Sequence, residues 1–276
     1  MNAYTENGLI FTKRENGAYF SVRAANNNIR SANIPQYFMD IPVKIIDENA
    51  FCGCSRLEEI SIPDSITDVG LDAFSGCRSV KRVRVQSLSA WCGITFWNSQ
   101  SSPLAFADNA VLYVNNSPLT EAALPDGIKE VKNYAFCGCT SLQSVVIKSY
   151  VTSIGHEAFL GCSSLESIVI PESVTYIGTL AFCECKSLSR ISIPVGVAEI
   201  KDLTFCGCTS LELVSLPDGI EYIGNRAFYE CPSLKSIVLP KYLHSIGNEA
   251  FAKCASLTYP DIPKGVNSIG INAFTR

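Results

Sequence analysis

The stretch F-L-G-C-S-S-L-E-S-I-V-I-P-E-S-V-T-Y-I-G-T-L-A, residues 159–181, begins with a phenylalanine and is followed directly by another, Phe182. The pattern recurs at a period of 23 residues, with one longer step of 62 residues. The phenylalanines that mark it are Phe51, Phe74, Phe136, Phe159, Phe182, Phe205, Phe228, Phe251 and Phe274. A period of about 20 to 29 residues is typical of leucine-rich repeats, in which each unit forms one coil of a solenoid.

Apolar residues occupy fixed positions after each phenylalanine. In the quoted stretch Leu165 follows six positions later, and Ile168 and Ile170 follow nine and eleven positions later. A spacing of two places both isoleucines on one face of a β-strand, and Pro171 ends the strand because it cannot donate a ladder hydrogen bond. Gly178 is expected to allow a left-handed turn. Since one coil cannot bury these residues alone, the sequence predicts a right-handed repeat solenoid with a parallel β-sheet on one face.

The residues eight and ten positions after each phenylalanine are expected to point away from the core. Most are small or of mixed polarity, which suits an extended protein surface better than a deep small-molecule pocket. One local concentration of positive charge, around Arg82 and Arg84, is either an ordinary solvated coil, which we favour, or a site for an acidic partner. The candidate binding residues on this face are Glu59, Arg82, Arg84, Arg190 and Tyr259.

An irregular long unit at about residues 86–124 interrupts the period. It contains Trp91 and Trp97, and its segments Ala105-Phe106 and 111–114 resemble a degenerate phenylalanine turn and strand. We therefore expect the solenoid to continue through it. The aromatic residues either pack around one thick coil, which we favour, or form a projecting patch that binds a partner. In the second interpretation Trp91 and Trp97 are binding residues.

The N-terminal residues lie outside the period. Residues 9–14 and 18–22 are apolar, strand-forming segments joined by Glu15-Asn16-Gly17, which is a strong hairpin signal. This hairpin is expected to cover the open edge of the first coil, so the sequence predicts a cap at 1–32 and a solenoid at 33–276. No equivalent cap is expected at the other end, where the exposed edge favours self-association or a C-terminal continuation.

The chain has 13 cysteines, and most of them stand three positions after a phenylalanine of the period. Such a column could hold a metal stack or disulfides. Parallel Cβ directions between stacked coils disfavour disulfides, and the Cys-x-Cys pairs supply at most half of a zinc site. We therefore predict a buried ladder of free thiols whose S–H groups bond to neighbouring carbonyls, with no metal and no cofactor. So many free thiols suit a reducing or anaerobic environment.

Catalysis, nucleic-acid binding and membrane insertion all lack support in the sequence. There are only 2 histidines, which limits acid–base chemistry near neutral pH, and no nucleophile elbow, phosphate loop or zinc-protease motif occurs. The formal charge of −4 gives no electrostatic footprint for nucleic acid. No apolar stretch approaches the roughly 18 residues of a membrane span. The sequence predicts a protein that is not an enzyme.

The recurring pattern G-C-x-S-L-x-x-I-x-I-P-x-x-V-x-x-I-G-x-x-A-F, seen at residues 161–182, resembles the BspA-like, or Treponema pallidum-type, leucine-rich repeat family. The resemblance covers about residue 33 to the end and includes the long unit. It implies a surface or secreted bacterial protein that acts in adhesion by binding host, matrix or other surface proteins. The sequence departs from that pattern because it shows no secretory signal and no anchor, so a cytoplasmic thiol-rich or metal-binding repeat protein is the alternative.

Overall fold

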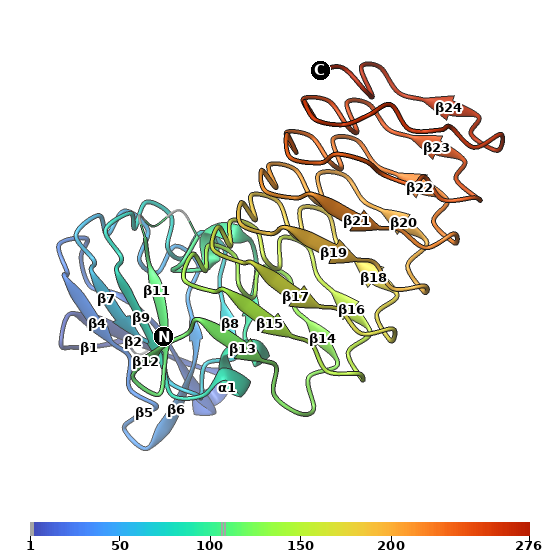
Figure 1. Cartoon of the computed structure of the whole chain (residues 1–276). Helices are drawn as coiled ribbons and strands as arrows, with labels where there is room; N and C mark the ends of the chain where they lie inside the picture. The colour runs from blue at the N-terminus through green and yellow to red at the C-terminus, as the bar shows by residue number, and fades with distance from the viewer. Residues whose placement is uncertain (1–2, 106, 108) are drawn as a thin grey trace. The chain divides into compact units, whose positions relative to one another are not determined.

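The computed structural model describes residues 3–105, 107 and 109–276. Phe106, the phenylalanine of the predicted degenerate turn, lies outside the described residues. The chain divides into two compact units (Figure 1). Unit 1 comprises Met1–Leu119 and Lys132–Ser141, and unit 2 comprises Thr120–Val131 and Leu142–Arg276.

Both units consist of coils that stack through parallel strands, as the period predicts. In each, equivalent residues of successive 23-residue repeats pair with one another, as Glu59 does with Arg82 and Ser144 with Ser167. The fold is therefore the predicted repeat solenoid. The division into a cap at 1–32 and a solenoid at 33–276 stays a prediction.

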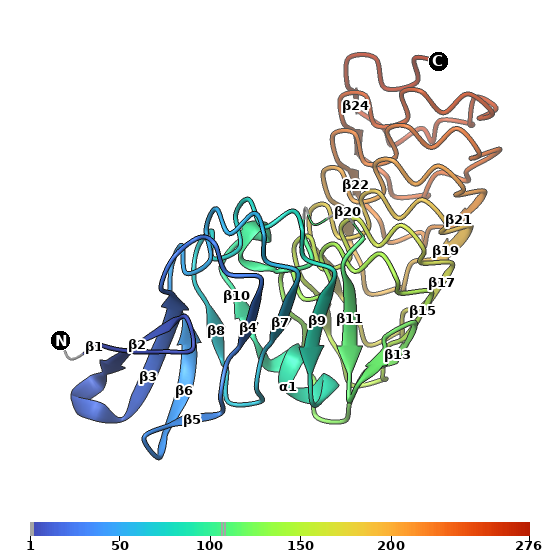
Figure 2. The same cartoon turned by 90° about the vertical axis from the view of Figure 1, so that its left-hand side faces the viewer.

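The first sheet of unit 1 holds its repeat strands (Figure 2). Ile60, Val83 and Leu112 lie opposite one another on adjacent strands and are fully buried. The predicted strand at 111–114 is thus confirmed, and it carries the ladder into the long unit. In order across the sheet the strands are β12 (Ser117–Pro118), β11 (Val111–Val114), β9 (Arg82–Val85), β7 (Glu59–Ser61) and β4 (Ser31–Asn33), and only the β11–β12 pair is antiparallel.

The second sheet of unit 1 begins with the predicted N-terminal hairpin, which is confirmed. Phe11 lies opposite Val22 in an antiparallel pair, and the 3-10 turn η1 (Glu15–Gly17) joins the two strands. Its last strand then pairs in parallel with the first coil, and Arg14 forms an ion pair with Asp47 at 2.8 Å. The strands run β1 (Ala3–Glu6), β2 (Leu9–Arg14), β3 (Tyr19–Ala24), β6 (Ile41–Ile46), β8 (Asp68–Val69) and β10 (Thr95–Phe96), with β5 (Tyr37–Phe38) on β6.

The long unit contains a short helix that the repeat pattern does not predict. Helix α1 (Leu88–Gly93) starts after Ser87, whose hydroxyl accepts a hydrogen bond from the amide of Ala90 at 3.1 Å. This is a normal N-cap, because a serine oxygen satisfies one of the free amides of the first turn. The helix directs Trp91 into the core. A 3-10 turn, η2 (Ser99–Ser101), follows it.

Unit 2 contains the regular repeats, and its strands form two parallel arrays. The strands on one side of the coils, called here the long-side strands, cover the positions eight to ten after the coil phenylalanine, as Ser167–Val169 do after Phe159, and shorter strands lie after the proline turn. The long-side strands are β13 (Glu121–Ala123), β15 (Ser144–Val146), β17 (Ser167–Val169), β19 (Arg190–Ser192) and β21 (Leu213–Ser215). The shorter strands are β14 (Glu130–Val131), β16 (Ser153–Ile154), β18 (Tyr176–Ile177), β20 (Glu199–Ile200), β22 (Tyr222–Ile223), β23 (Ser245–Ile246) and β24 (Ser268–Ile269).

The core of unit 2 is a column of stacked phenylalanine rings. The rings of Phe159 and Phe182 are 5.5 Å apart with an interplanar angle of 3°, and Phe182 and Phe205 repeat the arrangement at 5.5 Å and 1°. The rings of Phe228 and Phe251 continue it at 5.1 Å. All five are fully buried, and burying one such side chain contributes about 1.5–3 kcal/mol. Each coil therefore supplies one layer of the same core.

The glycine before each new coil has a different role from the predicted one. A Cβ atom on Gly178 would lie 2.5 Å from the backbone nitrogen of His156, and one on Gly247 would lie 2.5 Å from that of Asn225. Neither glycine has a positive φ. The left-handed residue stands two positions later, as at Leu180 with φ of 59°. The predicted left-handed turn at Gly178 is therefore wrong, because close approach of the preceding coil is what excludes a side chain there.

Candidate functional site

Two of the predicted site residues, Arg190 and Tyr259, lie on the outward side of the long-side strands of unit 2 and of the equivalent positions in the last coils, which have no strand there. Val146 pairs with Val169 in the strand register, and their side chains are 47% and 60% exposed. Further along, Leu213, Val238 and Tyr259 are also exposed. The predicted outward direction of these positions is thus confirmed. We call this surface the strand face; it comprises Ser144, Val146, Ser167, Val169, Arg190, Ser192, Leu213, Ser215, Ser236, Val238, Tyr259 and Asp261.

Arg190 lies on the strand face beside a shallow depression. It is exposed and pairs in register with Leu213 on the next strand. Ser189 and Glu212 complete the lining of the depression, which has a volume of about 330 Å³. Glu212 forms an ion pair with Lys235 at 2.8 Å, and this hydrogen bond lowers the pKa of the Glu212 carboxyl. The depression thus carries charges of both signs around an exposed leucine.

Tyr259 occupies the same strand face on a later coil. Its ring is 68% exposed, and one side of it contacts the ring of Phe274 at 4.9 Å with an interplanar angle of 49°. The contact holds the ring in place while its other side remains open to solvent. A tyrosine held in this way can bury a large area on binding with little loss of side-chain entropy.

The other predicted residues of the strand positions form a charged cluster in unit 1. The carboxylate of Glu59 accepts hydrogen bonds from the Nε atoms of Arg82, at 2.7 Å, and Arg84. Donation by Arg84 and then Arg82 lowers the pKa of Glu59. The Arg84 guanidinium also lies 5.0 Å from the centre of the Tyr113 ring. Because one carboxylate already engages both guanidinium groups, the favoured interpretation of a solvated coil fits this cluster better than an anion site.

The two tryptophans of the long unit have opposite environments. Trp91 is fully buried, its Nε1–H donates to the carbonyl oxygen of Ala135 at 2.8 Å, and its ring lies 5.2 Å from Phe96. The prediction that Trp91 is a binding residue is therefore wrong, because helix α1 turns it into the core. Trp97 is 60% exposed and keeps its place among the candidates. Of the two tryptophans in the predicted aromatic patch, Trp97 alone is at the surface.

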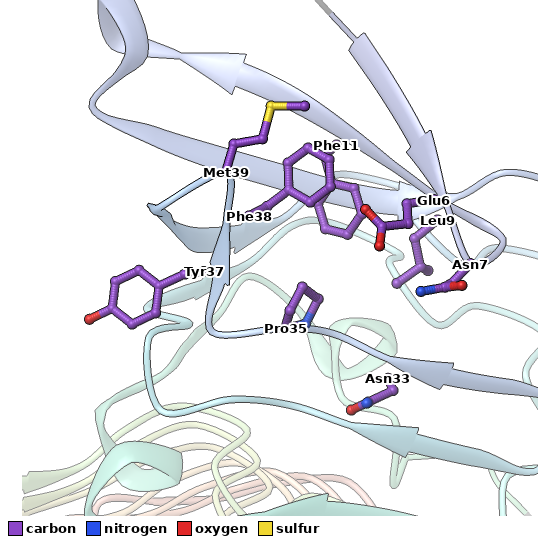
Figure 3. A pocket seen from close by; sticks show the side chains of 9 residues that line it. All are labelled: Glu6, Asn7, Leu9, Phe11, Asn33, Pro35, Tyr37, Phe38 and Met39. Carbon is purple, nitrogen blue, oxygen red and sulfur yellow. The ribbon is translucent and has the colours of Figure 1, made fainter.

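A cavity in unit 1 was not foreseen from the sequence (Figure 3). It has a volume of about 330 Å³, and its apolar wall includes the stacked rings of Phe11 and Phe38, which are 4.2 Å apart. At its rim Met39 has a φ of 50° and is 60% exposed. Met39 and Asp40 form a two-residue turn between β5 and β6. The lining residues are Glu6, Asn7, Leu9, Phe11, Asn33, Pro35, Tyr37, Phe38 and Met39.

The cysteine column forms the predicted thiol ladder, and all cysteines are free. Five thiols of the column donate to the carbonyl oxygen of a phenylalanine in the preceding coil, as Cys185 does to Phe159 at 3.2 Å and Cys208 to Phe182 at 3.1 Å. Cys54, in the first coil, donates instead to the carbonyl oxygen of Asn26 at 3.9 Å. Burial raises the pKa of the Cys185 thiol. In the described part of the chain, no group of three or more His, Cys, Asp or Glu side chains converges as a metal site requires.

The histidines are far apart in the sequence and are engaged differently. The Nε2 atom of His156 is 2.8 Å from the hydroxyl oxygen of Tyr176. His244 is exposed, and its ring lies 6.0 Å from that of Tyr222.

Within residues 3–105, 107 and 109–276, the structure contains no helix with the length and apolar character of a membrane span.

Comparison with solved structures shows the same fold in several bacterial proteins. A leucine-rich cell surface protein from Faecalibacterium prausnitzii is 24% identical, with a TM-score of 0.56, over 98% of this chain and 95% of that chain. A leucine-rich repeat protein from Eubacterium ventriosum is 20% identical, with a TM-score of 0.61, over 98% and 93%. The pneumococcal vaccine antigen PcpA is 15% identical, with a TM-score of 0.54, over 100% and 86%. At these identities the likeness establishes the fold alone.

Comparison at the sequence level gives one family. No curated protein matches the sequence. A family model described as the BspA type leucine-rich repeat region, with 6 copies, matches residues 24–109, 108–212 and 177–276. The model covers most of the chain and agrees with the resemblance of the repeat pattern. The protein therefore belongs to the BspA-type leucine-rich repeat family.

Proposed function

We propose that this protein is a non-enzymatic scaffold that binds a protein partner through the strand face of unit 2. The observation that carries the proposal is that exposed apolar side chains occur on most coils of this face. Val169, Val238 and Tyr259 are 60%, 84% and 68% exposed, and Val146 and Leu213 are also exposed, whereas the coil between Val169 and Leu213 carries Arg190 and Ser192. Contiguous apolar patches on a soluble protein commonly mark interaction sites.

The shape and composition of the strand face favour a protein over a small molecule. Its side chains are spaced by the strand separation of about 4.8 Å, so they form a shallow, extended surface. A typical specific interface buries about 800 Å² on each partner, which needs several coils. Arg190 and the Glu212–Lys235 pair lie beside the apolar residues and resemble the polar rim that surrounds the apolar centre of such interfaces.

We also propose that the protein acts at the cell surface and binds host, matrix or other surface proteins. The support is family membership together with the structural likeness to a protein described as a cell surface protein. Protease treatment of intact cells tests this location. Loss of the protein from intact cells, with a cytoplasmic marker preserved, is the expected result, and full protection would contradict it.

Binding to a panel of extracellular-matrix and host-surface proteins tests the strand face. The double variant Val169→Lys and Val238→Lys places two charges in the apolar row without touching the core. We expect binding to weaken at least about tenfold, which corresponds to about 1.4 kcal/mol. The matched control is Val195→Lys, because Val195 is 72% exposed but lies in the turn after Pro194 rather than on the strand face.

A second variant separates the strand face from the long unit. Trp97→Ala removes the exposed tryptophan and leaves buried Trp91 in place, so the fold is retained. Binding that survives Trp97→Ala and falls with the double lysine variant supports the proposal. The opposite pattern would move recognition to the long unit, and no binding to any member of the panel would contradict the adhesive role.

Self-association through the last coil is a further part of this proposal. Ile269 and Ile271 are 45% and 76% exposed there. Sedimentation velocity over a range of concentrations tests it, with Ile271→Asp as the variant expected to dissociate any dimer. A chain that sediments as a monomer at every concentration would contradict self-association and leave the strand face unaffected.

A further inference from the structure

The position directly after the coil phenylalanine forms a second column, separate from the buried thiol ladder. Its residues in chain order are Cys52, Ser75, Cys137, Leu160, Cys183, Cys206, Tyr229, Ala252 and Thr275. In this column Cys183 and Cys206 are the two cysteines that stand exactly one 23-residue period apart. They therefore belong to adjacent coils.

Backbone hydrogen bonds fix the two cysteines side by side. The amide of Phe182 donates to the carbonyl of Thr204 at 2.9 Å, and the amide of Glu184 donates to that of Cys206 at 2.7 Å. These bonds flank Cys183 on both sides, so its Cα lies about 4.8 Å from that of Cys206, as expected for parallel neighbours. This separation falls inside the range of about 4.4–6.8 Å that a disulfide spans, and because Cβ directions of stacked coils are parallel, the two turns must shift locally for the sulfurs to bond.

The two thiols are close enough to affect each other's ionisation. The neighbouring Cys206 thiol raises the pKa of Cys183, and the neighbouring Cys183 thiol lowers the pKa of Cys206. The buried ladder differs, because there Cys185 and Cys208 donate to phenylalanine carbonyls of the preceding coil. In the second column, neither Cys183 nor Cys206 takes part in this carbonyl ladder, and each has the other as its equivalent in the adjacent coil.

Exposure also separates the two columns. Cys206 is half-buried, whereas Cys185 and Cys208 are 0% exposed. Around Cys206 the guanidinium of Arg226 favours the thiolate, and the carboxylates of Glu184 and Glu230 oppose it. Both carboxylates are paired with lysine ammonium groups, which weakens that opposition. Cys206 is thus the accessible member of the pair, and Cys183 lies behind it with 6% exposure.

We propose that Cys183 and Cys206 form an oxidant-accessible dithiol that hydrogen peroxide converts into a disulfide between adjacent coils. The Cys206 thiol releases its proton, the thiolate attacks one peroxide oxygen, the O–O bond breaks, and the departing hydroxide takes up the released proton to leave as water. The Cys183 sulfur then attacks the sulfenic sulfur of Cys206. The S–O bond breaks, and the second hydroxide takes the Cys183 proton. Two thiols and one peroxide thus give one disulfide and two waters.

Peptide mapping of the full-length reduced protein tests this site. The folded chain is treated with an equimolar amount of hydrogen peroxide, blocked with iodoacetamide and digested with a glutamate-specific protease. Cleavage after Glu172 and Glu184 places Cys183 alone in peptide 173–184, and cleavage after Glu199 and Glu212 releases peptide 200–212. We expect these two peptides to be linked, and dithiothreitol to separate them.

Two serine variants assign the linkage. Peptide 200–212 contains both Cys206 and Cys208, so Cys206→Ser should abolish the link and Cys208→Ser should leave it. Iodoacetamide should also modify Cys206 before Cys208 in the folded, untreated protein. Circular dichroism of both variants checks that the coils remain folded.

Three results would overturn the proposal. They are a link that persists in Cys206→Ser, oxidation of Cys206 to a sulfinic acid without any link, and alkylation of Cys206 no faster than that of Cys208. Should Cys208→Ser unfold, fragment spectra of the linked wild-type peptides identify which sulfur of peptide 200–212 is bonded to Cys183.

Discussion

The coils of unit 2 keep the 23-residue period, whereas unit 1 contains the N-terminal strands and most of the long unit, up to Leu119. In unit 2 each layer of the core is a phenylalanine ring stacked on the next. In unit 1 the long unit fills its layer with Trp91, delivered by helix α1 and bonded to Ala135. The regular coils thus all use the same contact, the stacking of phenylalanine rings. The long unit depends instead on the packing and hydrogen bond of Trp91, which no other coil repeats. The following substitutions test that difference.

Phe205→Ala should have the largest effect, because this ring is fully buried and stacks on both Phe182 and Phe228. Deleting such a side chain costs about 3–5 kcal/mol, measured as the loss of unfolding free energy in urea. Phe274→Ala is the control, since Phe274 is only half-buried and stacks on Phe251, with a tilted contact to the exposed Tyr259 on another side. Equal losses of unfolding free energy for the two variants would contradict a ring column in which stacking on both sides adds to stability.

Gly178→Ala should destabilise unit 2 by about 1–3 kcal/mol through overpacking. The added methyl group would lie 2.5 Å from the backbone of His156, so the two coils must separate. Gly219→Ala is the matched control, because its nearest neighbour there is the Val195 carbonyl at 3.7 Å. Thermal unfolding of both variants measures the difference. A neutral Gly178→Ala would mean that the coils can shift apart freely.

Trp91→Phe sharpens the comparison from the side of unit 1. The phenyl ring retains much of the apolar volume but leaves the Ala135 carbonyl without its donor. An unsatisfied buried group costs about 1–3 kcal/mol, measured by urea unfolding. Trp97→Ala, at an exposed position, should change stability by less than about 0.5 kcal/mol. A larger loss of stability for Trp97→Ala than for Trp91→Phe would contradict the placement of Trp91 in the core and Trp97 at the surface.

Glu59→Gln should have the smallest effect, because Arg82 and Arg84 bind this carboxylate at the surface. Exposed ion pairs contribute about 0–1 kcal/mol. The pKa of Glu59 is lowered in the folded state, so its stabilisation is present above the unfolded pKa of about 4.3 and disappears as the pH falls through the lower, folded value. Urea unfolding at pH 7 and pH 3 should show the wild-type advantage shrinking, and an advantage that grows in acid would contradict the ion pairs.

The period made the regular coils predictable, because a spacing of two apolar residues before a proline specifies one strand and its exit. It also placed Glu59, Arg82 and Arg84 on neighbouring strands, where the structure finds them paired. Gly178 was misjudged because sequence alone does not separate a need for positive φ from a need for close approach. Glycine meets both requirements, so the sequence looks the same in either case.

The long unit and the cavity were harder to predict for a different reason. Burial of Trp91 depends on helix α1. This helix has only 6 residues, and the N-cap Ser87 is the one sequence signal that indicates where it starts. The cavity depends on a two-residue turn at Met39-Asp40, and these residues lack the glycine or asparagine that normally marks such turns. Both features arise from contacts between segments distant in the sequence.

The thiol ladder has a consequence for how this chain can change in length. Cys208 donates to Phe182, one coil earlier, and Cys185 donates to Phe159 in the same way. Removing residues 183–205 would join Phe182 directly to Cys206. Cys208 would then take the place of Cys185 and donate to the Phe159 carbonyl, so the thiol-to-carbonyl hydrogen bonds would be re-formed. Within the regular coils, an excision or duplication that is not a whole period would displace the thiol ladder and the ring column together. The regular coils can therefore gain or lose length only by entire coils, whereas the long unit, which departs from the period, fills its core with Trp91 instead.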